Sequence, residues 1–237
     1  MIVTLRTPLG DIVAKQPRAG AVFERLQIDY CCQGNLALGV ACDGVKADPE
    51  VVLQQFRRAV AEAIDERDWT QAPLRDLANH IVSAHHAWLR RRAAAVASSL
   101  EKLPEGGDGV SGSCREALAS RLNRFREPLE PHLRLEERRV FPAIARAEQL
   151  HRARRPIAPG ADMRLKDGLP PLVREHCAID ETMRDLRREA ARILGAHPAA
   201  STLLQDLTAI ESDLHRHLHL EINILFPRAM ALEDAYA

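Results

Sequence analysis

One stretch decides the fold of this chain: His132-Leu-Arg-Leu-Glu136-Glu-Arg-Arg-Val140-Phe141-Pro142. It recurs 85 residues later as His217-Leu-His-Leu-Glu221-Ile-Asn-Ile-Leu225-Phe226-Pro227. Four residues make about one turn of an α-helix, so each His lies on the same face as its Glu. An imidazole and a carboxylate one turn apart can bind one cation. Two such helices in one bundle therefore predict a pair of metal ions.

The composition agrees with a helical protein that works without membrane or nucleic acid. The 237 residues are 46% hydrophobic and only 4% aromatic, with abundant Ala, Leu, Arg and Glu, which favour helices. The formal net charge is zero, which gives no electrostatic reason to expect nucleic acid or anionic lipid as a partner. No run of 18 apolar residues occurs, so we expect no membrane span.

The cysteines and the N-terminus predict a cytoplasmic protein. Five cysteines are an odd number without the spacing of a disulfide framework (Cys31, Cys32, Cys42, Cys114 and Cys177). Charged residues interrupt the first 16 positions, which do not resemble a signal peptide.

The positions of prolines, glycines and apolar residues divide the chain into two predicted domains. Residues 1–67 read as a small helical domain with helices near 8–15, 17–26, 35–42 and 49–67. Residues 73–237 read as an antiparallel four-helix bundle with helices near 73–102, 114–148, 171–194 and 199–230. Pro128 and Pro131 predict a kink or break in the second helix, and residues 151–170 read as a long surface loop. The predicted fold class is therefore all-α.

A bundle that uses two His-x-x-x-Glu helices needs further ligands from its other two helices. The first helix offers His80, His85 and His86, among which the spacing does not choose, and the third offers His176. Imidazoles with carboxylates suit iron, zinc or manganese, and carboxylates that bridge two ions leave coordination positions open. A surface ion pair explains most single His-x-x-x-Glu pairs, but the repetition of the pair with the same Phe-Pro favours metal binding.

Four residues neighbour the candidate ligands in the sequence. Glu137 is predicted to be solvated, whereas Glu175 is equally compatible with the site and with solvent. Phe141 and Phe226 are predicted to pack in the core beneath the site rather than to contact a cofactor.

The chain resembles a known family at this point. Residues 73–237 are similar to hemerythrin-like di-iron four-helix domains. The stretch Asp29-Tyr30-Cys31-Cys32-Gln33-Gly34 is close to the Asp-Tyr-Cys-Cys-Gly-Gly motif of a short N-terminal domain. In this order, the two domains resemble the Repair of Iron Centres family of bacterial iron-sulfur cluster repair proteins.

The resemblance implies a ligand set and a task. It selects His86, thirteen residues after Pro73, and completes the metal ligands as His86, His132, Glu136, His176, His217 and Glu221. It implies two non-haem iron ions with oxo and carboxylate bridges, and damaged iron-sulfur proteins as partners. The expected role is repair of clusters damaged by nitric oxide or oxidants, by iron supply rather than conventional catalysis, with nitric oxide chemistry at the di-iron centre left open.

Several alternatives stay open. The chain can instead be an oxygen or nitric oxide carrier or sensor of hemerythrin type, although typical oxygen carriers use five His ligands. Cys31 and Cys32 are candidates for redox chemistry or partner binding, or they are two small residues in a tight turn. Gln33 replaces a glycine, which costs about 1 kcal/mol if that position needs a positive φ. A homodimer is a further expectation, with the N-terminal domain serving assembly.

Overall fold

The computed structural model describes residues 2–61, 67–103, 110–155, 164–195 and 200–234. Within these ranges every regular element is helical, and an isolated antiparallel bridge joins Pro8 to Ala37. The all-α prediction is confirmed. None of the described helices is both long enough and apolar enough to cross a membrane.

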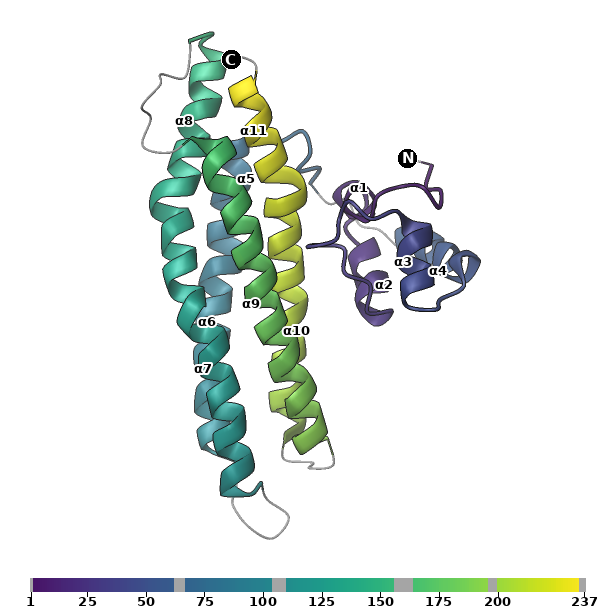
Figure 1. Cartoon of the computed structure of the whole chain (residues 1–237), viewed down its shortest axis with the longest axis vertical. Helices are drawn as coiled ribbons and strands as arrows, with labels where there is room; N and C mark the ends of the chain where they lie inside the picture. Colours follow the sequence, from purple (N-terminus) through teal and green to yellow (C-terminus); the bar gives the residue numbers. More distant parts are fainter. Residues whose placement is uncertain (1, 62–66, 104–109, 156–163, 196–199, 235–237) are drawn as a thin grey trace.

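Four long helical rods form the antiparallel bundle that the sequence predicts (Figure 1). Three of the rods contain a short π-helical segment, labelled η, and the third rod is one uninterrupted helix. The rods are α5 (Leu74–His80), η1 (Ile81–His86) and α6 (Ala87–Glu101); α7 (Gly112–Leu135), η2 (Glu136–Val140) and α8 (Phe141–Arg152); α9 (Leu165–Leu194); and α10 (Ser201–His219), η4 (Leu220–Leu225) and α11 (Phe226–Asp234).

Of the kink or break predicted near residues 127–131, the break does not occur, because α7 runs through Pro128 and Pro131 as one helix. Each proline removes one helical hydrogen bond, and that loss is offset by packing. The side chains that recur on the inner face of α7 are buried: Leu118, Leu122, Phe125, Leu129 and Leu133. Tertiary burial therefore outweighs the local preference of the two prolines.

The loop predicted over residues 151–170 is shorter than expected, and its residues 156–163 lie outside the described part of the chain. The helix α8 extends to Arg152, and α9 begins at Leu165, six residues before the predicted start. The Glu233 carboxylate accepts hydrogen bonds from the backbone N–H groups of Leu165 at 2.8 Å and Lys166 at 3.1 Å. These bonds satisfy two N–H groups that a helix start leaves unpaired, so a distant residue fixes this boundary.

The bundle interior consists of two apolar halves with a polar layer between them. Leu89, Leu129, Ile179 and Leu214 belong to one buried cluster. The corresponding residues two or three turns away along each rod belong to the other cluster (Ile81, Val140, Leu172 and Ile224). The predicted metal ligands all fall between these two sets of positions along their rods.

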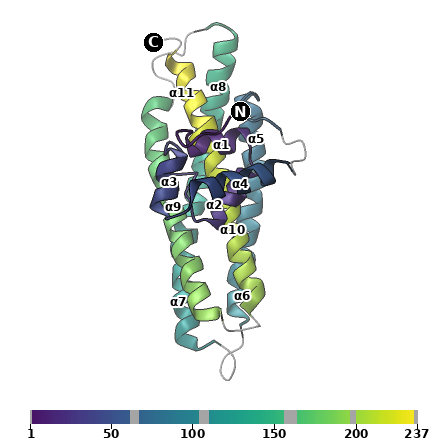
Figure 2. The same ribbon diagram turned by 90° about the vertical axis from the view of Figure 1, so that its right-hand side faces the viewer.

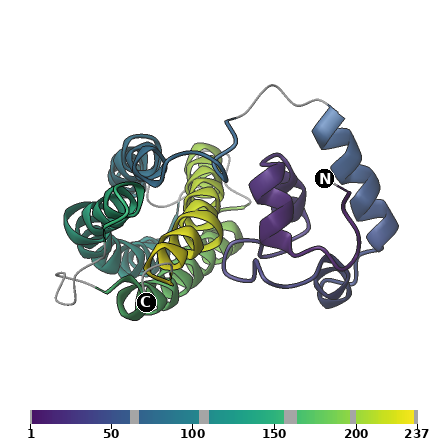
Figure 3. The same cartoon turned by 90° about the horizontal axis from the view of Figure 1, so that it is seen from above.

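A small helical domain packs on one side of the bundle (Figures 2 and 3). It consists of α1 (Leu9–Lys15), α2 (Ala19–Arg25), α3 (Leu38–Gly44) and α4 (Pro49–Ala61), which surround their own apolar core. The helix α1 contacts η4, and α2 contacts α10. Across this interface Ser212 donates a hydrogen bond to Glu24 at 2.8 Å, and Arg184 pairs with Asp29 at 3.1 Å.

Candidate metal centre

The structure brings all six predicted ligands together in the polar layer of the bundle. They form two overlapping groups whose nitrogen and oxygen atoms lie within 4.8 Å of one another. One group contains His86, His217 and both carboxylates, and the other contains His132, His176 and Glu136. The histidines of the two groups pair the first rod with the fourth and the second with the third, which is compatible with an approximate twofold repeat.

Each carboxylate faces both histidine pairs. Glu136 places Oε1 at 3.2 Å from Nε2 of His132 and 2.9 Å from Nε2 of His176, while its Oε2 lies 3.5 Å from Nε2 of His86. Glu221 places Oε1 at 3.1 Å from Nε2 of His217, and its Oε2 lies 3.1 Å from Nε2 of His176. Two oxygens aimed in different directions are what a carboxylate needs to bridge two cations.

The centre is closed off from solvent, and several of its polar atoms lack hydrogen bonds. Glu136 and Glu221 are 0% exposed, and His132, the most exposed of the six ligands, reaches only 5%. Three inward-facing atoms form no hydrogen bond among the described residues: Nε2 of His132, Oε2 of Glu136 and Oε2 of Glu221. Buried polar atoms without partners are costly, and two adjacent buried carboxylates need positive charge beside them. The donor set therefore fits metal cations.

The protonation of the metal-free centre follows the same logic. Burial acts to raise the pKa of Glu221, but His217 and His176 outweigh it and hold this pKa well below its usual value. Burial acts to lower the pKa of His176, but the Glu221 and Glu136 carboxylates raise it to about 10. A proton on His176 thus offsets part of the carboxylate charge without metal, and metal ions displace such protons on binding.

Three of the six ligands lie in π-helical segments. His86 ends η1, Glu136 begins η2, and Glu221 is the second residue of η4. A π-helical turn holds an extra residue and redirects the side chains beyond it, and such turns are frequent at functional sites. Pro142 and Pro227 follow directly as the second residues of α8 and α11, where the widened turn relieves the usual clash of a proline inside a helix.

Two glutamates outside the predicted set orient the ligands. The Oε1 atom of Glu137 lies 2.9 Å from Nδ1 of His86, and Arg90 donates to the same oxygen at 2.7 Å. The expectation that Glu137 is solvated is therefore wrong. Glu175, which the sequence left undecided, lies 3.1 Å from Nδ1 of His132. A partner on Nδ1 fixes the ring and its tautomer, so that Nε2 is presented to a metal.

Phe141 and Phe226 pack against the centre as expected. The Phe141 ring stacks on His86 with the ring centres 5.7 Å apart, and the Phe226 ring stacks on His176 at 5.8 Å. The repeated Phe therefore supports one ligand ring in each half of the centre.

Of the other histidines in the described part of the chain, none belongs to the two donor groups. His85 bonds to Asp213 at 3.0 Å, His80 stacks on Trp69, and His215 lies 3.0 Å from Asp180. The spacing alone could not separate His85 or His80 from His86, whereas their partners in the structure do.

Cys31 and Cys32 lie in the loop between α2 and α3, against the bundle rather than in the metal centre. Gln33 is exposed, and its φ angle is not positive. The conformational cost expected from replacing a glycine at this position therefore does not arise. Gly34 is the constrained position, because a Cβ atom there would collide with the Asn223 side chain. The same Asn223 side chain donates hydrogen bonds to the Tyr30 and Cys31 carbonyls at 3.2 and 3.0 Å, which attaches this loop to η4.

The fold and the buried donor set define a hemerythrin-like metal-binding bundle with an added N-terminal domain. The family described as hemerythrin HHE cation binding domain matches residues 77–229. A second family, ScdA_N, described as a domain of unknown function, matches residues 5–60. This domain assignment and the His/Glu cluster together indicate iron binding.

The chain also has curated relatives over nearly its whole length. It is 30% identical to the iron-sulfur cluster repair protein YtfE of Edwardsiella ictaluri, over 94% of this chain and 96% of that protein. It is 27% identical to the protein of the same name from Escherichia coli O157:H7, over 95% and 97% of the two chains. For the Pectobacterium carotovorum protein the identity is 29%, over 94% and 96%. The chain belongs to the Repair of Iron Centres family.

Proposed function

We propose that this chain is a di-iron protein that repairs iron-sulfur clusters damaged by nitrosative or oxidative stress. In this proposal His86 and His217 bind one iron ion, His132 and His176 bind the other, and the two carboxylates bridge them together with an oxo group. The observation that carries the proposal is the placement of Glu136 and Glu221, whose oxygens face both histidine pairs. The names of the curated relatives support the task.

The protein's own residues give the centre three properties. The apolar clusters above and below the ligands exclude water from the carboxylates. Glu137 and Glu175 hold two ligand rings with Nε2 turned inward. Six protein ligands leave coordination positions unfilled on two ions, so the centre stays open to exchange. When bound, the ions supply a redox-active reservoir of iron, and we propose that iron delivered from it is the cargo that rebuilds a damaged cluster.

The proposed partners are damaged iron-sulfur proteins in the cytoplasm. The five cysteines are all free thiols, which suits a reducing compartment. Among the described residues, the exposed large apolar side chains lie in the N-terminal domain: Ile2, Leu5, Val40, Val45 and Val51. These side chains support the proposal of a homodimer formed through this domain, and sedimentation of the iron-loaded protein tests it.

The repair experiment uses an iron-sulfur dehydratase inactivated by nitric oxide. Iron-loaded protein is expected to restore dehydratase activity, whereas Glu136→Leu and His217→Leu proteins and the metal-free wild type are not. Equal recovery with the metal-free wild type would contradict iron supply. A stable, reversible oxygen adduct without repair activity would instead support the carrier or sensor.

A further inference from the structure

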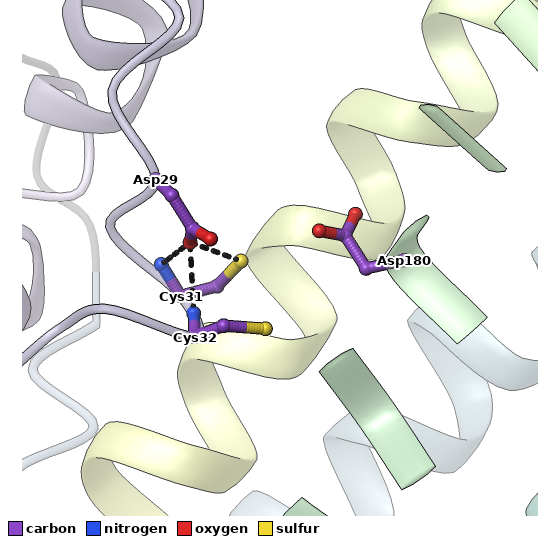
Figure 4. Close-up of side chains that lie close together, drawn as sticks. All are labelled: Asp29, Cys31, Cys32 and Asp180. Carbon is purple, nitrogen blue, oxygen red and sulfur yellow. Dashed lines mark hydrogen bonds between the residues drawn. The ribbon is translucent and has the colours of Figure 1, made fainter. Parts of the chain in front are cut away.

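The Cys31-Cys32 loop is held in one conformation by Asp29. The Asp29 Oδ1 atom accepts hydrogen bonds from the backbone N–H groups of Cys32 at 2.9 Å and Cys31 at 3.2 Å, and from the Cys31 thiol at 3.2 Å (Figure 4). In this turn both sulfur atoms point toward the bundle, where Asp180 of α9 faces them. Two thiols in adjacent positions are thus displayed on one side of the loop.

Residues from both domains complete the cluster. One donor atom from each of Asp29, Cys31, Cys32 and Asp180 lies within 4.8 Å of the others. A third thiol, that of Cys177 on α9, lies beside the Cys32 thiol. Cys177 precedes Asp180 by three residues on α9, so the two side chains share one helix face.

One carboxylate oxygen of the cluster forms no hydrogen bond. Arg184 contacts Oδ2 of Asp29 at 3.1 Å and Oδ2 of Asp180 at 2.7 Å, which offsets part of the negative charge. Asp180 is only 2% exposed, yet its Oδ1 forms no hydrogen bond within the described residues, although His215 lies 3.0 Å away. This buried oxygen has the His215 imidazole as its charge partner but no hydrogen bond, so it keeps a lone pair free to bind a cation beside the thiols.

We propose that Cys31, Cys32, Cys177 and Asp180 bind a single thiophilic transition-metal ion of the Fe²⁺ or Zn²⁺ class, separate from the bundle centre. Sulfur-rich four-coordinate sites favour iron or zinc over magnesium or calcium. Asp29 is a positioning residue, because its Oδ1 is already occupied by the loop. Binding releases the thiol protons to solvent and leaves the oxidation state of the ion unchanged. Cys31 is buried while Cys32 and Cys177 are partly exposed, so an ion can enter from one side.

The position of this second metal site gives it a role that rests on the proposed function. Cys177 directly follows His176, so neighbouring residues of α9 supply a donor to each site. In this role the three thiols would hold an iron ion that leaves the bundle centre before it reaches a client protein.

Cobalt titration tests the second metal site without depending on repair activity. Full-length, iron-loaded protein is first reduced with a phosphine, and a thiol reagent applied to a sample confirms five free thiols per chain. Co²⁺ is then added in the absence of oxygen. Only thiolate ligands give sulfur-to-cobalt charge-transfer bands, so the His and Glu donors of the bundle centre are silent. We expect bands that saturate at one Co²⁺ per chain. Cys32→Ser and Cys177→Ser each remove one thiolate donor. Because loss of a residue that only orients a ligand already weakens metal affinity about 10- to 100-fold, we expect each variant to weaken Co²⁺ binding by at least that factor.

A matched control uses Cys114, a partly exposed cysteine at the start of α7. Cys114→Ser should bind Co²⁺ as the wild type does, and all three variants should keep the iron content of the bundle centre. Absence of the bands in the wild type, or equal bands in Cys177→Ser, would overturn the second metal site. If Cys32→Ser loses Co²⁺ binding but repairs clusters at the wild-type rate, the holding role is overturned. The proposed function fails separately, if Glu136→Leu still repairs.

Discussion

The two halves of the metal centre have matching inner donors but different outer support. Each half has two buried imidazoles and one oxygen from each carboxylate directed toward it. On one side Nδ1 of His86 contacts Glu137, which Arg90 holds in place. On the other side Nδ1 of His132 contacts Glu175, whose side chain is 56% exposed. The repeated motif gives both halves the same donor atoms. The surrounding residues hold the ligands of the His132/His176 half less firmly, so we expect this half to bind its metal ion more weakly.

The largest effect is expected from removing a carboxylate that serves both halves. Glu136→Ala takes away donors to both histidine pairs and should abolish binding of both iron ions. Iron analysis of protein purified without oxygen measures this, and far-ultraviolet circular dichroism checks that the bundle remains helical. Retention of a full iron complement would show that Glu136 does not bridge.

Removing one histidine from each half separates the two iron positions. His217→Ala should empty the His86/His217 half, and His132→Ala the other half, each leaving part of the iron in place. The Mössbauer spectra of the two partly loaded variants should then differ, because each reports the opposite half. Identical spectra would mean that the two variants disturb the same ion.

The outer glutamates should distinguish the halves by a smaller amount. Glu137→Gln loses a partner that is held by Arg90 and should speed iron loss to a chelator about 10- to 100-fold. Glu175→Gln should have a smaller effect, because water already competes for its exposed carboxylate. Chelation rates followed by absorbance measure both. The control is Glu181→Gln, which changes an exposed glutamate on α9, the helix that carries Glu175. A larger effect from Glu175→Gln would reverse the ranking of the halves.

The smallest effect is expected from the aromatic rings, and it should be equal in both halves. Phe141→Leu and Phe226→Leu each shrink a ring that stacks on a ligand histidine. Each should lower the free energy of unfolding of the metal-free protein by about 1 to 2 kcal/mol. Urea denaturation measures both values, and a difference beyond the error of the method would show that the inner packing is not equivalent.

The repeated motif explains how much of the centre the sequence could predict. His132 with Glu136, and His217 with Glu221, share a helix turn, so their spacing alone places each pair on one face. His86 was different, because three histidines occur on its helix and only the family resemblance selected it. The pairing of the first rod with the fourth is a tertiary arrangement that no local spacing contains.

The outer residues could not be predicted, for a physical reason. On a regular helix Glu137 is turned about 100° away from Glu136, which suggests solvent. The π-helical segment η2 changes that direction, and no residue pattern identified it in advance. Cys177 is 145 positions from Cys32 in the sequence, so their contact depends on how the two domains pack. The unbroken helix through Pro128 and Pro131 shows the same dependence on packing.

The central claim is that two iron ions share the carboxylates of Glu136 and Glu221. Iron analysis combined with the Mössbauer spectrum of the oxidised protein tests it most directly. We predict two iron ions per chain with a diamagnetic ground state, because bridged ferric ions couple antiferromagnetically. One iron ion per chain, or two ions with uncoupled paramagnetic spectra, would contradict the account.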